Sequence, residues 1–169
     1  MILKIVKYPE PVLSQPGEPV TDFDADLRKL VADMFETTYH NQGIGLAAPQ
    51  VGVSKRLTVI DLSMGKDPEK KLVLINPEII FQDGKVYEEE GCLSLPDINE
   101  KVRRAGWVKV RAQNAKGEHF EVEGEDLLAR ALQHETDHLN GILFIDRMKS
   151  ATKTALKGKL KRLQRETLG

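Results

Sequence analysis

The chain has 169 residues, of which 40% are hydrophobic and 30% are charged. This composition is typical of a globular protein, and the length predicts one main domain. No apolar run is long enough for a membrane span or a secretory signal, so we expect a cytoplasmic protein. The single cysteine, Cys92, excludes an internal disulfide, and its thiol is therefore free, buried or a ligand.

The net charge of −1 conceals an uneven distribution along the chain. Residues 147–169 carry eight basic residues and one acidic residue, whereas residues 1–146 carry 17 basic and 25 acidic residues. We therefore expect a catalytic domain over residues 1–146 and a basic helical tail over residues 147–169. A basic tail on an acidic body suggests a polyanionic or membrane-surface partner.

In chain order, residues 1–20 are rich in proline and are predicted to be extended. A helix is predicted to start at Asp22 or Asp24 and to run to about Tyr39, because apolar residues then recur at helical spacing. Residues 43–50, GIGLAAPQ, are predicted to form a tight loop rather than a core strand, since they are rich in glycine and alanine. Their GxG lacks the third glycine of a dinucleotide fingerprint, which argues against nucleotide binding.

The middle of the chain reads as strands. Residues 57–62 and 72–75 are predicted to be buried strands, and a hairpin is predicted to pair residues 79–81 with 85–88. A second hairpin is predicted to pair residues 107–113 with 119–123. Short turns between strands predict an α+β fold, with antiparallel sheets packed around a central helix and further helices at the two ends of the chain.

The central helix carries residues 133–138, QHETDH, and is predicted to run from Glu125 or Asp126 to residues 140–141. His134 and His138 are four residues apart and therefore share one helix face, where they can bind one metal ion. Glu135 can then act as general base on a water bound to that ion. Two core histidines without a metal are the alternative. The predicted burial of this helix favours the metal site, because burying such groups uncompensated is costly.

A catalytic metal needs a third protein ligand. The downstream pattern HExxHxxGxxH fails here, because Phe144 stands where the third histidine would be. The upstream candidates are His40, which ends a helix, His119, which opens a solvated strand, and Cys92. The missing ligand favours the Cys92 thiolate. One sulfur and two imidazoles suit Fe2+, Zn2+, Co2+ or Ni2+, and the ligands alone do not choose between these ions.

These motifs together resemble the peptide deformylases of bacteria and organelles. The resemblance rests on residues 43–50 (GIGLAAPQ), 90–94 (EGCLS) and 133–138 (QHETDH), and it extends over nearly the whole chain. It implies a metal-dependent hydrolase that removes the formyl group from the N-terminal formyl-methionine of newly synthesised polypeptides. It also implies that Cys92, His134 and His138 hold the metal, with Fe2+ as the family's usual ion.

The resemblance further implies roles for residues around the metal. Glu135 would move the protons, and the Gln50 side-chain amide and the Leu93 backbone N–H would stabilise the oxyanion. The substrate backbone and its methionine side chain would lie against five residues: Ile44, Gly45, Gly91, Leu127 and Ala131. Asp137 is expected behind the ligands, with Arg104 as its best partner.

Two positions depart from the apolar residues common in the family, namely Glu88 and Arg130. If both line the rim of the methionine pocket, they could pair with each other or turn outward, and the two arrangements imply different pocket shapes and different preferences for the downstream residues of the substrate.

Two other functions remain open from the sequence: a small zinc peptidase and a non-catalytic, metal-stabilised ribosome-binding module. Glu135 argues against the ribosome-binding module, because a structural metal site has no use for it. A zinc peptidase would instead be distinguished by its cleavage of internal or unformylated peptides.

The basic tail has Leu156, Leu160 and Leu163 at helical spacing. It is expected either to pack on the domain as a solvated helix or to dock to ribosomal RNA. The expected partners are nascent polypeptides and the ribosome rather than a membrane, and a monomer is expected.

Overall fold

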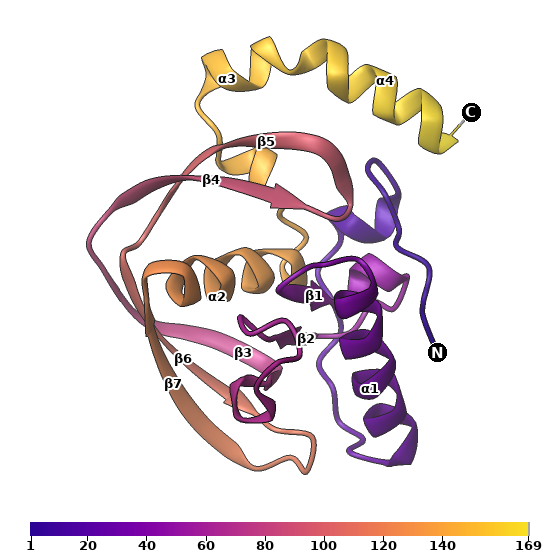
Figure 1. The fold of residues 1–169 in the computed structure, drawn as a ribbon, viewed down its shortest axis with the longest axis vertical. Coiled ribbons are helices and arrows are strands. Elements are labelled where there is room, and N and C mark those ends of the chain that lie inside the picture. Colours follow the sequence, from indigo (N-terminus) through magenta and orange to yellow (C-terminus); the bar gives the residue numbers. More distant parts are fainter. Residues whose placement is uncertain (169) are drawn as a thin grey trace.

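The computed structural model describes residues 1–168 and has the predicted α+β architecture (Figure 1). The α-helices are α1 (Ala25–His40), α2 (Asp126–Leu139), α3 (Ser150–Ala155) and α4 (Lys157–Leu168). The strands are β1 (Gly45–Ala47), β2 (Leu57–Ile60), β3 (Leu72–Asp83), β4 (Val86–Cys92), β5 (Leu95–Arg104), β6 (Trp107–Gln113) and β7 (His119–Glu125). Short 3-10 helices occur at Pro11–Ser14, Ala48–Val51, Pro68–Lys70 and Phe144–Arg147.

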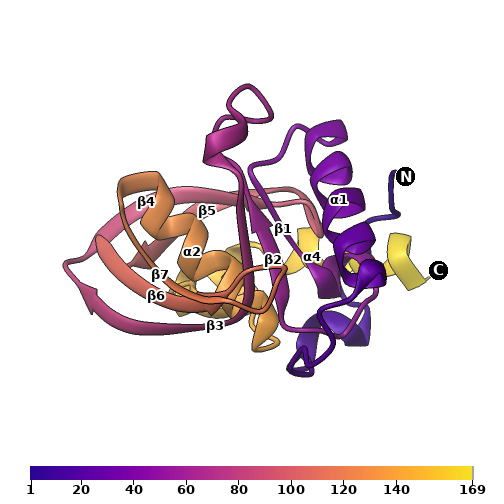
Figure 2. The same ribbon diagram turned by 90° about the horizontal axis from the view of Figure 1, so that it is seen from below.

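The strands form two antiparallel sheets. One has the order β1-β2-β3-β6-β7, and the other consists of β4 and β5. Helix α2 lies between the two sheets (Figures 1 and 2). Its residues Ala129, Ala131 and Leu132 share a buried cluster with Val108 and Val110 of β6. Apolar packing therefore fixes α2 on the large sheet, while its contacts with β4 and β5 include the polar pairs His134–Glu90 and Asp137–Arg104.

Strand β2 is buried on both faces, which explains why Thr58 is its only polar residue. Side chains alternate along a strand, so Leu57 and Val59 point to one face and Ile60 to the other. Leu57 and Val59 belong to the cluster of helix α1, whereas Ile60 belongs to that of helix α2. The two helices thus cover opposite faces of the same strand.

Helix α1 agrees with its prediction from the sequence. The Asp24 side chain accepts a hydrogen bond from the Leu27 backbone N–H at 3.0 Å, which caps the first turn. Its apolar face, including Met34 and Phe35, is buried.

The prediction of a loop at residues 43–50 is wrong in part. Residues Gly45–Ala47 form strand β1, which pairs with β2 in the register Gly45↔Ile60 and lies at the edge of the large sheet. The small residues serve close packing here, because a Cβ on Gly45 would lie 3.2 Å from the Glu135 carboxylate. Low strand propensity is overridden by this long-range contact.

The predicted hairpin between residues 79–81 and 85–88 is also wrong. Strand β3 continues to Asp83 and pairs with β6, while β4 pairs with β5 in the other sheet. Gly84 between them has φ +73°, and the chain leaves the large sheet there. The second predicted hairpin is confirmed as β6–β7, with Gly117 in the turn at φ +84°.

The basic tail packs on the rest of the chain through its leucines. Leu156, Leu160 and Leu163 are buried in one cluster with Leu95 and Ile98 of β5. Near the end of α4, the Thr167 hydroxyl donates a hydrogen bond to the Tyr8 carbonyl at 2.7 Å. In Figure 1 helices α3 and α4 lie across the outer side of β4 and β5. Within residues 1–168, no helix has the length and apolar character needed to cross a membrane.

Candidate metal centre and active site

Three potential metal ligands converge at the end of β4 and the C-terminal half of α2. The ligand atoms of Cys92, His134 and His138 all lie within 4.8 Å of one another. His138 Nε2 is 3.2 Å from His134 Nε2 and 3.3 Å from Cys92 Sγ. Donors bound at usual distances to one tetrahedral ion lie roughly 3.3–3.6 Å apart. The two separations from His138 are close to this range and the third is at most 4.8 Å, so the cluster could hold a divalent metal.

The far side of His134 is held by a carboxylate. Its Nδ1 lies 3.0 Å from Glu90 Oε1, so Nε2 is free to face the other two donors. Glu90 in turn accepts two hydrogen bonds from Arg104, at 2.9 and 3.0 Å. Burial alone would raise the pKa of Glu90, but the contacts with His134 and Arg104 outweigh it and hold the pKa at about 2. Glu90 therefore remains charged beside the site.

Sequence reasoning did not assign a role to Glu90, although a signal was present. Alternate residues of a strand share one face, and Glu90 stands two residues before Cys92 on β4. Regular alternation predicts that Glu90 faces α2 together with Cys92, and the structure places both there although the pairing register shifts between Gly91 and Cys92.

Asp137 joins this charged group from helix α2. Arg104 Nη1 donates to Asp137 Oδ2 at 2.6 Å, the pair suggested by the sequence. Arg147, which the sequence did not indicate, donates to both Asp137 oxygens at 2.9 and 3.1 Å. Buried carboxylates need such partners, because an unpaired charge in the interior is costly.

The two histidines hold protons very differently in the protein alone. Burial lowers the pKa of His134, but Cys92 and Glu90 outweigh it and raise the pKa to about 10. In His138, burial and the positive charge of His134 lower the pKa well below its usual value. His138 Nδ1 is buried and has no hydrogen-bond partner within residues 1–168. Imidazole and thiolate bind a metal ion only in their deprotonated forms. A bound cation would therefore replace the proton that His134 holds in the protein alone.

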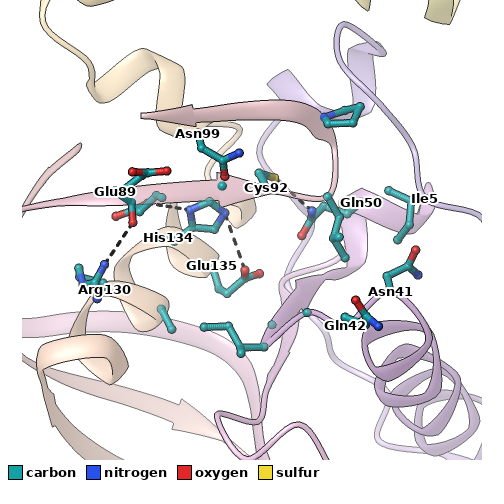
Figure 3. Close-up of a pocket in the computed structure, with 18 of the residues that line it drawn as sticks. Ile5, Asn41, Gln42, Gln50, Glu89, Cys92, Asn99, Arg130, His134 and Glu135 are labelled. Carbon is teal, nitrogen blue, oxygen red and sulfur yellow. Dashed lines mark hydrogen bonds and ion pairs between the residues drawn. The ribbon is translucent and has the colours of Figure 1, made fainter. Parts of the chain in front are cut away.

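Glu135 lies beside the donors and faces the cavity. Its Oε1 is 3.9 Å from His134 Nε2, and its Oε2 accepts a hydrogen bond from the Thr58 hydroxyl at 3.2 Å. In Figure 3 its carboxylate points towards His134. Burial raises the pKa of Glu135 to about 6, although the nearby positive charge of His134 and the Thr58 hydroxyl lower it. Such a carboxyl group can both accept and donate a proton near neutral pH.

Gln50 approaches Cys92 from the opposite side. Its Oε1 accepts a hydrogen bond from the Ala47 N–H at 2.9 Å, which orients the amide. Nε2 then lies 3.4 Å from Cys92 Sγ and 3.3 Å from Ser94 Oγ. Leu93, directly after Cys92, lines the same cavity. The side chain of Gln50 thus presents N–H donors beside the metal ligands.

A cavity of about 620 Å³ opens in front of these groups. Its lining includes every residue expected from the sequence to contact substrate: Ile44, Gly45, Gly91, Leu127 and Ala131. A Cβ at Gly91 would overlap the Asn99 Oδ1 atom, so a side chain there would require Asn99 to move.

Of the two unusual rim positions, only Arg130 lines the cavity. Glu88 does not line the cavity: its side chain is exposed, and the neighbouring Glu89 lines the cavity instead. Glu88 precedes Glu90 by two residues, which places it about 7 Å further along the strand and outside the cavity.

The fold and the site together define a class: a small hydrolase with an HExxH helix and the donor set of a metal centre. The polypeptide deformylase family model matches residues 2–154. A peptide deformylase from Acidobacterium capsulatum is 62% identical over 165 residues, covering 98% of this chain and 97% of the relative.

Solved structures agree with this likeness. A peptide deformylase from Legionella pneumophila has a TM-score of 0.90 and 44% identity, covering 98% of this chain and 96% of that one. One from Plasmodium falciparum has a TM-score of 0.92 and 41% identity, covering 96% of each chain. The chain belongs to the polypeptide deformylase family. Its activity is the hydrolytic removal of the formyl group from new polypeptides.

Proposed function

We propose that Cys92, His134 and His138 hold one divalent metal ion, and that Glu135, Gln50 and Leu93 carry out deformylation beside it. The observation that carries this assignment is the convergence of three donors within 4.8 Å next to a buried glutamate. When bound, the ion supplies Lewis acidity, lowering the pKa of a water and polarising the formyl carbonyl.

Glu135 is the proposed proton carrier. In hydrolysis the bond between the formyl carbon and the methionine nitrogen breaks, and the oxygen of water ends in formate. Glu135 accepts the proton of the attacking water and delivers a proton to the leaving nitrogen. Its raised pKa, about 6, supports both steps, since a group of that pKa changes protonation easily at neutral pH.

The Gln50 amide and the Leu93 backbone N–H are the proposed oxyanion donors. Negative charge develops on the formyl oxygen as water adds, and donors aimed at that position in advance stabilise it by roughly 3–4 kcal/mol each. The hydrogen bond from the Ala47 N–H supports this role, because it fixes which end of the Gln50 amide faces Cys92.

We propose that the substrate backbone lies between Gly45 on β1 and Gly91 on β4. Edge strand β1 pairs with β2 on one side only, and the residues beside it line the cavity, so an extended peptide can add main-chain hydrogen bonds there. The methionine side chain would enter between Ile44, Leu127 and Ala131. Recognition of this kind reads the first residue and leaves the following side chains largely free.

For the ion itself we propose Fe2+, with Zn2+, Ni2+ and Co2+ as ions that the same donors can hold. The most direct test is anaerobic purification, followed by metal analysis and a formyl-Met-Ala-Ser assay on the same sample. About one equivalent of iron, and activity that declines in air and returns with fresh Fe2+, is expected. Activity that is equally high after complete metal removal would contradict the metal site, and cleavage of unformylated peptides alone would indicate a peptidase.

For the basic tail we propose docking to ribosomal RNA by a cytoplasmic monomer. Its lysine and arginine side chains are exposed while Leu156, Leu160 and Leu163 are buried, which leaves the charges available to a polyanion. Deleting the tail would uncover the core, so the sharper test replaces Lys157, Lys161 and Arg165 by glutamine. Weaker co-sedimentation with ribosomes at unchanged short-peptide turnover is expected. Unchanged ribosome affinity would reject the proposal.

A further inference from the structure

Arg130 is a cation at one end of the cavity, where both apolar residues and Glu89 line the wall. It lies on α2 one turn before His134, and it lines the cavity together with Leu127 and Ala131. Its Nη1 donates to the Glu89 carbonyl at 3.4 Å, a long hydrogen bond. Within residues 1–168, no carboxylate lies within 4.0 Å of the guanidinium as an ion-pair partner. A guanidinium has five N–H donors, so most of its hydrogen-bonding capacity is unused.

The distance along α2 from His134 to Arg130 is similar to the length of a methionine side chain. Arg130, His134 and His138 follow one another at intervals of four residues and so occupy one face of α2, about 6 Å apart along the axis. In an extended methionine, the formyl carbon and the thioether sulfur are also roughly 6 Å apart. In Figure 3 Arg130 and Glu89 lie at one end of the cavity, with Ile5 and Gln42 at the other. With the formyl group at the three metal donors, a methionine side chain that extends along α2 towards this end of the cavity would bring its sulfur near Arg130.

A thioether makes little use of such a donor, because its sulfur is a weak hydrogen-bond acceptor. Methionine sulfoxide, the first oxidation product, carries a strong acceptor oxygen on the same sulfur. In a wholly apolar pocket that oxygen would lose its water without replacement, which reduces kcat/KM by about 5- to 150-fold. The guanidinium can replace that water, and the partial exposure of Leu127 leaves this end of the pocket room for the larger group.

We propose that Arg130 makes this deformylase accept N-formyl-methionine sulfoxide as well as N-formyl-methionine, by donating a hydrogen bond to the sulfoxide oxygen. The inference rests on the proposed placement of the substrate in this cavity. The reaction is unchanged: the bond from formyl carbon to nitrogen is hydrolysed, formate leaves, and the sulfoxide stays at its oxidation level. Arg130 is a specificity-determining residue here and touches neither the formyl carbon nor the water.

The test compares formyl-Met-Ala-Ser with its sulfoxide, each epimer separately, in the metal-loaded wild-type protein and in Arg130→Leu. We expect wild-type kcat/KM values for the better epimer and the thioether to lie within about 10-fold of each other. In Arg130→Leu that ratio should shift by 10-fold or more against the sulfoxide, through its KM. Arg130→Gln, which keeps one donor group, should lie between the two and provides a readout if the leucine variant does not fold.

A matched control is available on α1. Arg28 also makes one long hydrogen bond to a carbonyl, Nη1 to Phe23 O at 3.3 Å, but it lies outside the cavity lining. Arg28→Leu should leave the substrate ratio unchanged. The proposal is overturned if the wild-type protein rejects both sulfoxide epimers by more than 100-fold, or if Arg130→Leu and Arg28→Leu give the same ratio. Loss of turnover of both peptides in the wild type would instead overturn the proposed function, and this inference with it.

Discussion

Helices α2 and α4 both present a buried face, but they bury different kinds of side chain. The buried residues of α2 include Gln133, Glu135, Asp137 and His138, whereas the buried residues of α4 are leucines. Burying polar groups is unfavourable unless they are paired, so they persist in α2 where chemistry requires them. We therefore expect substitutions in or against α2 to change catalysis and metal binding, and substitutions in α4 to change mainly stability.

The largest effect is expected for Glu135→Gln. Loss of the proton carrier should reduce turnover of formyl-Met-Ala-Ser by about 10²- to 10⁴-fold. Burial raises the pKa of Glu135, which means that the folded protein disfavours its charge. The variant should therefore keep its metal and unfold at the same or a higher temperature. Metal analysis and thermal unfolding check this, and a loss of turnover explained by loss of metal would contradict it.

The next effect is expected for Glu90→Gln, which leaves the buried Arg104 without one of its two carboxylates. Breaking a buried pair in this way destabilises a protein by about 3–5 kcal/mol. The His134 ring also loses the acceptor that orients it, so metal should dissociate faster into a chelator. Glu88→Gln, an exposed substitution on the same strand, is the control and should leave both properties unchanged.

Glu90 also predicts a dependence of stability on pH. Its pKa in the folded protein is about 2, below the ordinary value of 4.5. Its contribution is therefore complete above pH 4.5 and declines as the pH falls towards 2. Urea unfolding between pH 5 and pH 2.5 should show this loss in the wild type and a weaker loss in Glu90→Gln. Parallel curves for the two proteins would contradict the assignment.

Substitutions of the buried residues of α4 are expected to lower stability and to leave catalysis unchanged. Leu160 is buried against the cluster that contains Leu95 and Ile98, and Leu160→Ala should lower the free energy of unfolding by about 2–4 kcal/mol. Turnover of a short peptide well below the unfolding temperature should stay unchanged. Lys159→Ala, its exposed neighbour, should alter neither. A fall in turnover matching that of an α2 variant would break the contrast between the helices.

The same contrast explains which parts of the molecule the sequence could predict. The limits of α1 and α2 follow from local caps and periodicity, and the donor triad follows from a short motif that lacks its third ligand. The partner of β4 did not follow, because pairing depends on residues far along the chain. The strand at Gly45 was missed for a related reason. The small residue there is required by close packing against Glu135, which lies 90 positions later, and local strand propensity does not reveal that contact.

Arg147 was missed because its contact with Asp137 depends on the tertiary fold and leaves no local sequence signal. It reaches Asp137 from the segment after α2, and nothing in its sequence neighbourhood indicates a buried carboxylate. Glu90 was within reach of sequence reasoning, since it shares a strand face with Cys92. A charged group on the same strand as Cys92 was therefore open to prediction from the residues alone, whereas Arg104 on β5 was expected only through the resemblance to a known family.

The smallest expected effect has the opposite sign and lies in α4. Gly158 is helical, and a Cβ there would meet nothing within 4 Å. Gly158→Ala should raise the free energy of unfolding by up to about 1 kcal/mol, because alanine loses less backbone entropy in a helix. Gly84→Ala, at φ +73°, is the matched control and should destabilise. Urea unfolding measures both, and a destabilised Gly158→Ala would show that α4 is constrained by more than packing. No comparably free position lies beside the ligands, where Gly45 and Gly91 are already in close contact with other side chains.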